Sequence, residues 1–412
     1  MRWPIPPLAE VAPIRSRKPE IFDGTRRYYS TGAVGKNGEL DTPELVTFAE
    51  RPSRANCMPK IGDVGFARMS GTQKVVLVSE AELGSLFSTG FCFLEPNDAL
   101  DSKYLFYFLT SEGFQSEKNA LAGEGIMGGI KNSDVVNMQI PLPPMAEQQR
   151  IVRLLDEALE GIDIAKANAE KNLQNARALF ESYLRAAFTQ GGLERDGVER
   201  GQGAGMSGSW PVKTLAEVCQ LKPRKNEARE KLSPADEVSF VPMEDLGINL
   251  KHFKALKSRP LLDVASGYTY FAEGDVLLAK ITPCFENGKL GIATDLKNGV
   301  GFGSSEFYVL RPHENLSAEW LYYYLNRETF RVEGAARMSG AVGHRRVTKE
   351  FIETYPIPLP PLSEQQRIVN LLGKLQSSSE SMVAIQSKKI VALENLKRSL
   401  LSQAFSGGMV VD

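Results

Sequence analysis

Side chains that can read or hold nucleic acid occur in short clusters along this chain. Arginine and lysine can pair with guanine, asparagine and glutamine can pair with adenine, and cations with hydroxyls can hold phosphate. Candidates in the first half are Arg26, Arg27, Tyr28, Tyr29, Lys36, Asn37, Arg68, Gln73 and Lys74. Candidates in the second half are Lys222, Arg224, Lys225, Asn226, Lys280, Thr282, Asn287, Lys289, His344, Arg345 and Arg346. Each single residue could equally be an ordinary surface charge, so a cluster is a stronger indication of a binding site than any one residue. The cluster of residues 343–346 is the first choice for contact with DNA.

Motifs for catalysis or metal binding are not recognisable in the sequence. The three histidines, His252, His313 and His344, lack the spacing of a metal site. We find no Walker A motif, no GxSxG, no dinucleotide fingerprint and no Asn-Pro-Pro-Tyr-type string of adenine methyltransferases. The four cysteines are far apart and form no CxxC, which favours a reducing, cytoplasmic setting. We therefore predict a non-catalytic protein with no metal site.

The overall charge gives no general attraction to DNA. The chain has 412 residues, with 49 Lys and Arg against 50 Asp and Glu, and a formal net charge of −1. If it binds nucleic acid, local patches or a partner subunit must supply the positive potential. No apolar run has the length of a membrane span, and the first residues lack the apolar segment of a signal peptide, so we expect a cytoplasmic protein without membrane contact.

An internal repeat determines how these clusters are positioned. Residues 140–155 read IPLPPMAEQQRIVRLL and residues 357–372 read IPLPPLSEQQRIVNLL, an offset of 217 with 13 of 16 positions identical. Phe188 and Phe405 are separated by the same 217 residues, so nothing is inserted between the two marks. The fronts of the halves also match, at Trp3-Pro4 with Trp210-Pro211 and at Gly62-Asp63-Val64 with Gly274-Asp275-Val276. The chain therefore contains one unit twice.

A long helix is expected to follow each proline-rich motif. Apolar residues recur at three- and four-residue steps from Ile151 and again from Ile368, and the preceding prolines block an earlier start. Each helix should span about 43 residues, or roughly 64 Å at about 1.5 Å per residue. Ser363 with Gln366 fits a capping box at the second helix start.

The sequence between the helices predicts mixed α/β domains. Residues 74–78, 91–94 and 306–310 are typical of short strands, and the aromatic runs at 104–109 and 320–325 are typical of short buried helices. The expected organisation is domain one at 1–140, a proline-led helix at 141–188, a flexible linker at 189–209, domain two at 210–356, a second proline-led helix at 357–405 and a tail at 406–412.

The order of these parts predicts antiparallel helices. Domain two begins after the first helix and ends where the second begins, and a domain of its size, with a radius of gyration of about 15 Å, spans far less than either helix. We expect an α+β protein in which two similar domains are separated by an antiparallel helix pair, in a circular arrangement with a pseudo-twofold axis. Two similar but divergent domains on a rigid spacer suit a two-part, asymmetric DNA target.

The doubled IPLPPMAEQQRIV and IPLPPLSEQQRIV motif resembles the specificity subunits of type I restriction–modification enzymes. Residues 281–289, ITPCFENGK, and 301–312, GFGSSEFYVLRP, are similar to segments of their target recognition domains. The resemblance implies a split DNA target, two methyltransferase (M) subunits and restriction (R) subunits as partners. It also implies that S-adenosylmethionine, ATP and magnesium are used by those partners. Residues 67–74 of the first domain, ARMSGTQK, lack the Pro-Cys-Phe-Glu-Asn-Gly string.

The repeated Glu-Gln-Gln-Arg segments have two interpretations. As a partner-docking face they would use Glu147, Gln148, Arg150, Glu364, Gln365 and Arg367. As helix-start chemistry, their glutamates would favour the positive end of the helix dipole. For the whole chain, the alternative to DNA recognition is a coiled-coil adaptor that joins two protein-binding domains. A stand-alone nuclease or methyltransferase is disfavoured by the missing motifs.

Overall fold

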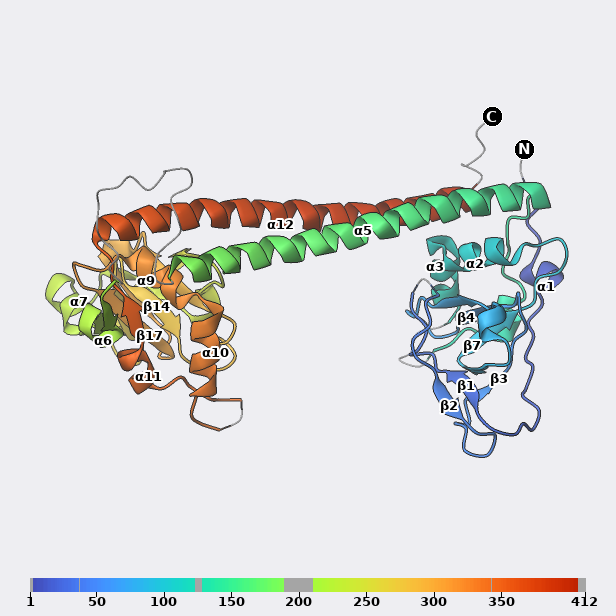
Figure 1. Ribbon diagram of the computed structural model, residues 1–412, viewed down its shortest axis with the longest axis horizontal. Coiled ribbons are helices and arrows are strands. Elements are labelled where there is room, and N and C mark those ends of the chain that lie inside the picture. Colours follow the sequence, from blue (N-terminus) through green and yellow to red (C-terminus); the bar gives the residue numbers. More distant parts are fainter. Residues whose placement is uncertain (1–2, 37, 123–127, 189–209, 342, 407–412) are drawn as a thin grey trace, which may run out of the picture. The chain divides into compact units, whose positions relative to one another are not determined.

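The computed structural model describes residues 3–36, 38–122, 128–188, 210–341 and 343–406. Asn37, the expected linker and nearly all of the expected tail lie outside these residues. The chain divides into two compact units, one formed by Met1–Lys171 with Gln386–Asp412 and the other by Asn172–Ile385 (Figure 1). Each unit contains one mixed α/β domain and a part of both long helices, which confirms the predicted fold class at this level. Over the described residues, no helix is both long and apolar enough to cross a membrane.

The first unit has two small sheets. The three-stranded sheet is antiparallel with order β5-β4-β7, formed by β4 (Val64–Ala67), β5 (Val75–Leu77) and β7 (Phe91–Leu94). The four-stranded sheet has order β2-β1-β6-β3, formed by β1 (Arg26–Tyr29), β2 (Glu44–Val46), β3 (Ala55–Cys57) and β6 (Leu86–Ser88). The helices of the first unit's domain are α1 (Leu8–Val11), η1 (Glu80–Glu82), α2 (Ser102–Thr110), α3 (Glu112–Leu121) and α4 (Asn132–Val135).

The second unit has sheets of five, four and two strands. The five-stranded sheet has order β11-β15-β14-β17-β9, with β9 (Cys219–Leu221), β11 (His252–Lys254), β14 (Val276–Ala279), β15 (Leu290–Thr294) and β17 (Phe307–Pro312). The four-stranded sheet has order β12-β10-β16-β13, with β10 (Glu237–Val241), β12 (Lys257–Pro260), β13 (Thr269–Ala272) and β16 (Val300–Gly303). A third pair joins β8 (Val212–Thr214) to β18 (Pro356–Pro358). The helices are α6 (Leu215–Val218), α7 (Asn226–Lys231), η2 (Met243–Asp245), α8 (Leu261–Val264), η3 (Lys297–Gly299), α9 (Ala318–Leu325), α10 (Glu328–Ala336) and α11 (Lys349–Thr354).

The two long helices, α5 (Met145–Ala187) and α12 (Leu362–Phe405), run antiparallel in each unit. In the first unit Lys166 pairs with Glu394 at 2.8 Å, and Lys397 with Asp163 at 3.5 Å, so numbers rise on one helix as they fall on the other. In the second unit the Ser379 hydroxyl donates to the carbonyl of Ala176, and Leu184 shares a core with Leu372. The predicted pair of long antiparallel helices is confirmed.

A phenylalanine at the end of each long helix packs into an aromatic helix. Phe405 lies 5.2 Å from the ring of Tyr104 and 5.5 Å from Phe108, both on α2. Phe188 directly follows α5 and lies 4.5 Å from the ring of Trp320 on α9. The equal offset of Phe188 and Phe405 in the sequence therefore reflects equivalent anchors, each of which adds edge-to-face ring contact to the buried area.

The matching Trp-Pro motifs join each domain's start to its proline-led segment. The amide of Leu142 donates to the carbonyl of Pro4 at 2.9 Å, and the amide of Leu359 donates to the carbonyl of Pro211 at 2.9 Å. Prolines have no amide hydrogen, so these segments can pair only at the leucines and neighbouring residues that retain one. The paired segments fix the direction from which each long helix starts.

The matching Gly-Asp-Val motifs are turns built around a buried carboxylate. Gly62 and Gly274 have φ of 86° and 83°, a conformation that favours glycine. The buried Asp63 and Asp275 side chains accept from the amides of Lys60 and Ala272 at 2.9 and 2.8 Å. Burial raises the pKa of both carboxyls, and arginine hydrogen bonds oppose that rise.

Candidate nucleic-acid interface

A lysine-rich cavity in the second unit is the strongest candidate for contact with a polyanion. Its volume is about 380 Å³, and its described lining includes Lys222, Lys225, Lys280, Lys349, Tyr268, Ser305 and Tyr308 but no carboxylate. The first two lysines lie between β9 and α7, the third follows β14, and Lys349 begins α11. Lysine ammonium groups and tyrosine side chains are chemically suited to phosphate and sugar.

Positive charges at this cavity are close enough to affect one another. Burial lowers the pKa of the Lys280 ammonium most, Arg346 and Lys222 lower it further, and Glu306 opposes them. Burial likewise lowers the pKa of Lys225, with added repulsion from Lys222 and Arg229. An anionic ligand bound here would offset this repulsion.

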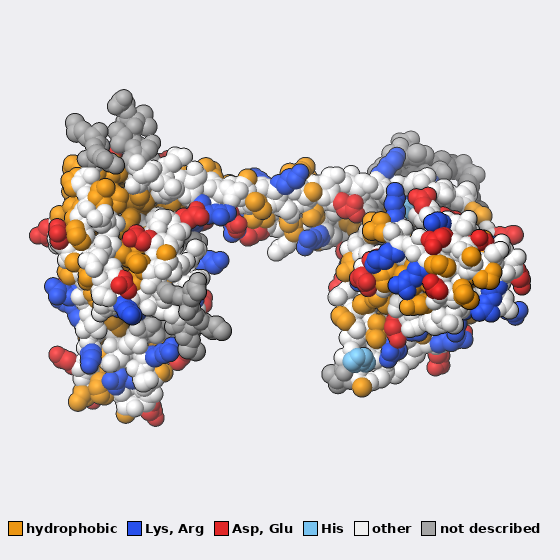
Figure 2. Space-filling model, turned by 180° about the vertical axis from the view of Figure 1, so that it is seen from behind, with side chains coloured by type: hydrophobic (Ala, Val, Ile, Leu, Met, Phe, Trp, Pro, Cys, Tyr) orange, Lys and Arg blue, Asp and Glu red, His pale blue; other side chains and the backbone are white. Residues whose placement is uncertain are grey.

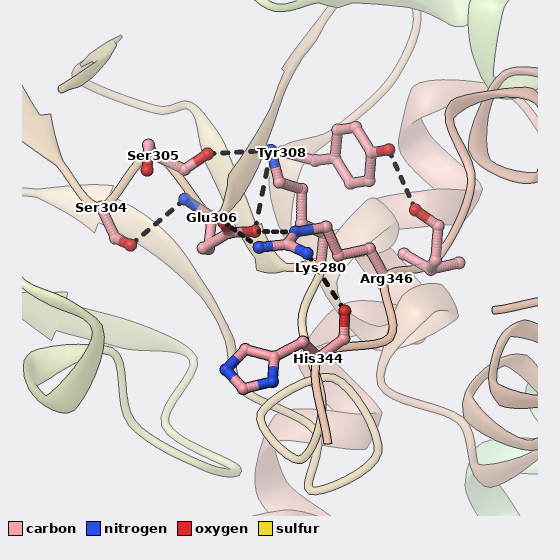
Figure 3. Close-up of polar contacts among 8 residues, drawn as sticks. Lys280, Ser304, Ser305, Glu306, Tyr308, His344 and Arg346 are labelled. Carbon is pink, nitrogen blue, oxygen red and sulfur yellow. Dashed lines mark hydrogen bonds and ion pairs between the residues drawn. The ribbon is translucent and has the colours of Figure 1, made fainter. Parts of the chain in front are cut away.

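An ion pair between Arg346 and Glu306 lies beside Lys280 and Ser305, which line the cavity (Figure 3). Arg346 donates from Nε and Nη2 to the two carboxylate oxygens of Glu306 at 2.9 and 2.8 Å. Its Nη1 donates to the carbonyl of His344 at 3.1 Å. Lys280 donates to the carbonyl of Ser305 at 2.8 Å, and its Nζ lies 4.0 Å from Glu306. These bonds lower the pKa of Glu306, with Arg346 as the largest cause, so the carboxylate stays ionised.

Three other candidates in the second unit have structural roles. Arg345 donates to the carbonyls of Ala335 and Met338 at 3.1 and 3.2 Å. The Nζ of Lys289 donates to the carbonyl of Met243 at 2.7 Å, and Thr282 donates to Glu286 at 2.8 Å. The remaining candidates of this unit, Arg224, Asn226, Asn287 and His344, have exposed side chains.

The first unit does not gather its candidates in the same way. Lys74 donates to the carbonyls of Thr31 and Gly32, Arg68 donates to those of Phe91 and Ile130, and Arg27 donates to that of Ala81. Arg26 donates to the sulfur of Met58 and lies over the ring of Phe22. Lys36 and Gln73 line a separate cavity of about 440 Å³ together with Lys166 and Arg398.

The prediction that Tyr28 and Tyr29 contact nucleic acid is wrong for this structure. Both side chains are about 5% exposed and belong to the hydrophobic core, and Tyr29 stacks on Phe87 at 5.2 Å. They are the inward end of β1, where an aromatic residue fills a small sheet's core. In this conformation neither ring can contact DNA.

The prediction that the Glu-Gln-Gln-Arg segments form a docking face is wrong for the first glutamine of each segment. Gln148 is fully buried, donates to the carbonyls of Ala99 and Pro143, and accepts from the amide of Asp101. Gln365 makes the same three bonds, to Asn315, Pro360 and Ser317, at 2.8–2.9 Å. Asp101 and Ser317 are the N-cap residues of α2 and α9, so each buried glutamine ties a long helix to an aromatic helix. These two amides cannot belong to an exposed docking face.

The flanking charged residues form local pairs. Glu147 accepts two bonds from Arg150, and Glu364 accepts two from Arg367, at 2.7–2.8 Å. All four side chains are partly exposed, so their role as docking residues stays a prediction. The expected capping box is wrong, because Ser363 lies inside α12 and Gln366 donates to Asn370 instead.

Replacing Gln365 by alanine is expected to lower the free energy of unfolding by about 2 kcal/mol, because three backbone groups lose their buried partner. The matched control is Gln366→Ala, since Gln366 is the exposed neighbour and should change stability by less than about 0.5 kcal/mol. Denaturant unfolding of both variants measures the difference. Equal effects of the two substitutions would contradict the structural role of Gln365.

Equivalent backbone positions carry different side chains in the two domains. The amide of Arg68 donates to Gly90 just as the amide of Lys280 donates to Glu306, both at 2.9 Å. Bridges join Met69 to Gly129 in the first domain and Ile281 to Arg346 in the second. The ion pair Glu306–Arg346 thus occupies the positions that Gly90 and Gly129 occupy in the first domain.

The clusters above missed several residues of this region. Glu306 and Tyr308 lie in the segment 301–312, which the sequence marked as a motif without assigning roles. In β17 the Tyr308 side chain is only partly buried between the buried Phe307 and Val309. Lys349 had no comparable signal, because only the fold brings α11 to the cavity.

The remaining surface agrees with the near-zero net charge. On the face drawn in Figure 2, Lys and Arg side chains alternate with acidic ones in both units and form no single basic surface. Within the residues described, no group of three or more His, Cys, Asp or Glu is placed to hold a metal ion.

Comparisons with known proteins agree on one family. The model of the type I restriction modification DNA specificity domain matches residues 8–175 and again residues 208–392. The specificity subunit of the Escherichia coli type I restriction enzyme EcoAI is 34% identical over 193 residues, which are 47% of this chain and 32% of that subunit. The chain thus aligns with about a third of the length of this curated relative.

Solved structures share the fold. The crystal structure of the HsdS subunit from Thermoanaerobacter tengcongensis has 25% sequence identity and a TM-score of 0.62, covering 99% of this chain and 97% of that chain. A chain from a structural study of complex assembly in the type I restriction–modification system has 24% identity and a TM-score of 0.76, covering 99% and 98%.

Proposed function

The chain belongs to the family of type I restriction–modification DNA specificity proteins, and on this premise we propose that each of its two domains reads one half of a split, asymmetric DNA target. The supporting observation is the contrast at equivalent positions of one framework. Gly90 and Gly129 in the first domain stand where Glu306 and Arg346 stand in the second. A shared backbone that carries charged side chains in one domain and glycines in the other is suited to placing two recognition surfaces alike while each recognises other bases.

The lysine-rich cavity would position the second domain on the DNA backbone. Lys222, Lys225, Lys280 and Lys349 carry charge without sequence information, so their contacts fix register and add affinity for any duplex. The helices α5 and α12 would act as the spacer that sets the gap between the half-sites. They would also dock two methyltransferase subunits.

The chemistry would come from partner subunits. We assign S-adenosylmethionine to the methyltransferase subunits, and ATP and magnesium to restriction subunits, while this chain supplies specificity only. Exposed apolar side chains on the long helices, among them Leu154 and Ile164 on α5, suit contact with such partners. A coiled-coil adaptor without DNA specificity is the competing function.

Exchanging residues 1–140 for the first domain of a related subunit tests this proposal. We expect adenine-methylation mapping of cells that carry the exchanged chain and its methyltransferase to show one new half-site, with the other half and the gap unchanged. The control is the matched exchange of residues 210–356, which should alter the opposite half. If either exchange changes both halves, the assignment of one reader to each domain is wrong.

A further inference from the structure

Arg346 retains hydrogen-bond donors after its internal bonds are made. A guanidinium has five N–H groups, and the bonds to Glu306 and His344 use one on each of its three nitrogens. One hydrogen therefore remains on Nη1 and one on Nη2. The side chain is 43% exposed, so these donors lie at the surface of the domain.

The backbone of Arg346 is fixed from both sides. Its amide donates to the carbonyl of Ser339 at 2.8 Å, and its own carbonyl accepts from the amide of Ser339 at 3.0 Å. On the other side, the backbone amide of Thr282 donates to the carbonyl of Arg345 at 2.9 Å, and the backbone amide of Val347 donates to the carbonyl of Lys280 at 2.9 Å. With Glu306 holding its side chain, the guanidinium is oriented before any ligand binds (Figure 3).

The neighbouring basic residues are less suited to reading a base. Arg345 is turned toward the carbonyls of Ala335 and Met338, and Lys280 donates to the carbonyl of Ser305. A lysine also has no planar pair of donors. Arg346 combines exposure, a fixed orientation and two donors that are still available.

From this geometry, and resting on the proposed function, we infer that Arg346 reads a guanine in the half-site of the second domain and that Glu306 is its positioning residue. Guanine presents O6 and N7 side by side in the major groove, and paired donors of arginine match them. The lysines of the adjoining cavity would hold the phosphates beside that base. Because the equivalent positions in the first domain are Gly90 and Gly129, the first domain reads its half-site without this pair.

The test uses the complex of the full chain with its methyltransferase partner. Methylation mapping first gives the wild-type target, and duplexes are then made with each guanine of the second half-site replaced in turn by 7-deazaguanine, which lacks N7. We expect one such duplex to bind the wild-type complex more weakly, while Arg346→Gln shows no further loss on it. Arg346→Gln should also lose discrimination at that base pair by roughly 5- to 150-fold.

Two further variants make the test specific. Arg346→Lys keeps the charge but not the planar fork, so discrimination should fall while general affinity for duplex is largely kept. Arg259→Gln is the matched control, because it removes one exposed arginine from β12 of the same domain and should leave the motif unchanged. Unfolding midpoints close to that of the wild type show that the variants are folded.

Glu306→Gln tests the positioning role. It should weaken discrimination at the same base pair, and it should have no added effect in an Arg346→Gln background. A purely structural role would instead lower stability and leave the response to 7-deazaguanine intact.

Several results would overturn the inference. These are a second half-site without a G·C pair, equal binding of all 7-deazaguanine duplexes, or an Arg346→Gln variant that keeps its motif and only loses affinity uniformly. Failure of the proposed function would look different, since the wild-type complex itself would then show no salt-sensitive preference for duplex DNA.

Discussion

Replacing Asp275 by alanine is expected to lower the free energy of unfolding of the second unit by about 3 kcal/mol, at the low end of the effect of breaking a buried ion pair. Asp275 is fully buried and accepts two bonds from Arg311, at 2.7 and 2.8 Å. It also accepts from the amide of Ala272. The loss is moderated because Arg311 keeps Glu227 at 2.6 Å and is partly exposed.

The measurement must resolve the second unit, since two units need not unfold together. Amide hydrogen exchange along β14, which directly follows Asp275, and along β17, which contains Arg311, reports the local stability of this unit. The control is Glu237→Ala, because Glu237 pairs with Lys297 at the surface and its loss should lower stability much less than the loss of Asp275. An Asp275→Ala variant as stable as this control would show that the buried turn does not hold the domain.

Raising the salt concentration from 50 to 200 mM is expected to weaken duplex binding by the reconstituted complex roughly 100-fold or more. The estimate takes a slope of about −0.9 in log affinity against log salt for each neutralised phosphate. It counts only the four lysines of the cavity, Lys222, Lys225, Lys280 and Lys349, and other contacts would add to it.

Removing one of these lysines should have a defined effect. Lys222→Gln, an exposed position, should reduce the slope by about one and weaken binding to all duplexes alike, without changing the methylated motif. The control is Lys254→Gln on β11, an exposed lysine outside the cavity lining. A complex whose affinity hardly responds to salt would favour the coiled-coil adaptor over DNA recognition.

Regular, local features of this protein were predictable from sequence alone. The constant offset of 217 residues predicted two long helices of similar length, and α5 and α12 are 43 and 44 residues long. Helical periodicity is visible in the sequence because the apolar residues on one face of a helix recur at three- and four-residue steps. The aromatic runs likewise proved to be α2 and α9, since a buried helix must carry large apolar side chains.

Individual side-chain roles were decided only by the tertiary structure. Gln365 and Gln366 are adjacent and chemically identical, yet one is buried with three partners and the other is exposed. Arg345 and Arg346 are adjacent too but differ in their partners, because Arg345 donates to backbone carbonyls and Arg346 donates to Glu306, 40 residues away. Partners so distant in the chain leave no spacing pattern in a single sequence.

The candidate nucleic-acid residues show what the sequence predicted and what the tertiary structure decided. The residue types and clusters indicated the chemistry, because only a few side chains can pair with bases or phosphate. The fold selected among them, since it placed Tyr28 in a core, brought Lys222 and Lys280 to one cavity and placed Arg346 near Lys280. The sequence by itself thus determined a repeated framework with two divergent surfaces. Only the packing of distant segments decided which polar groups of those surfaces remain available to a ligand.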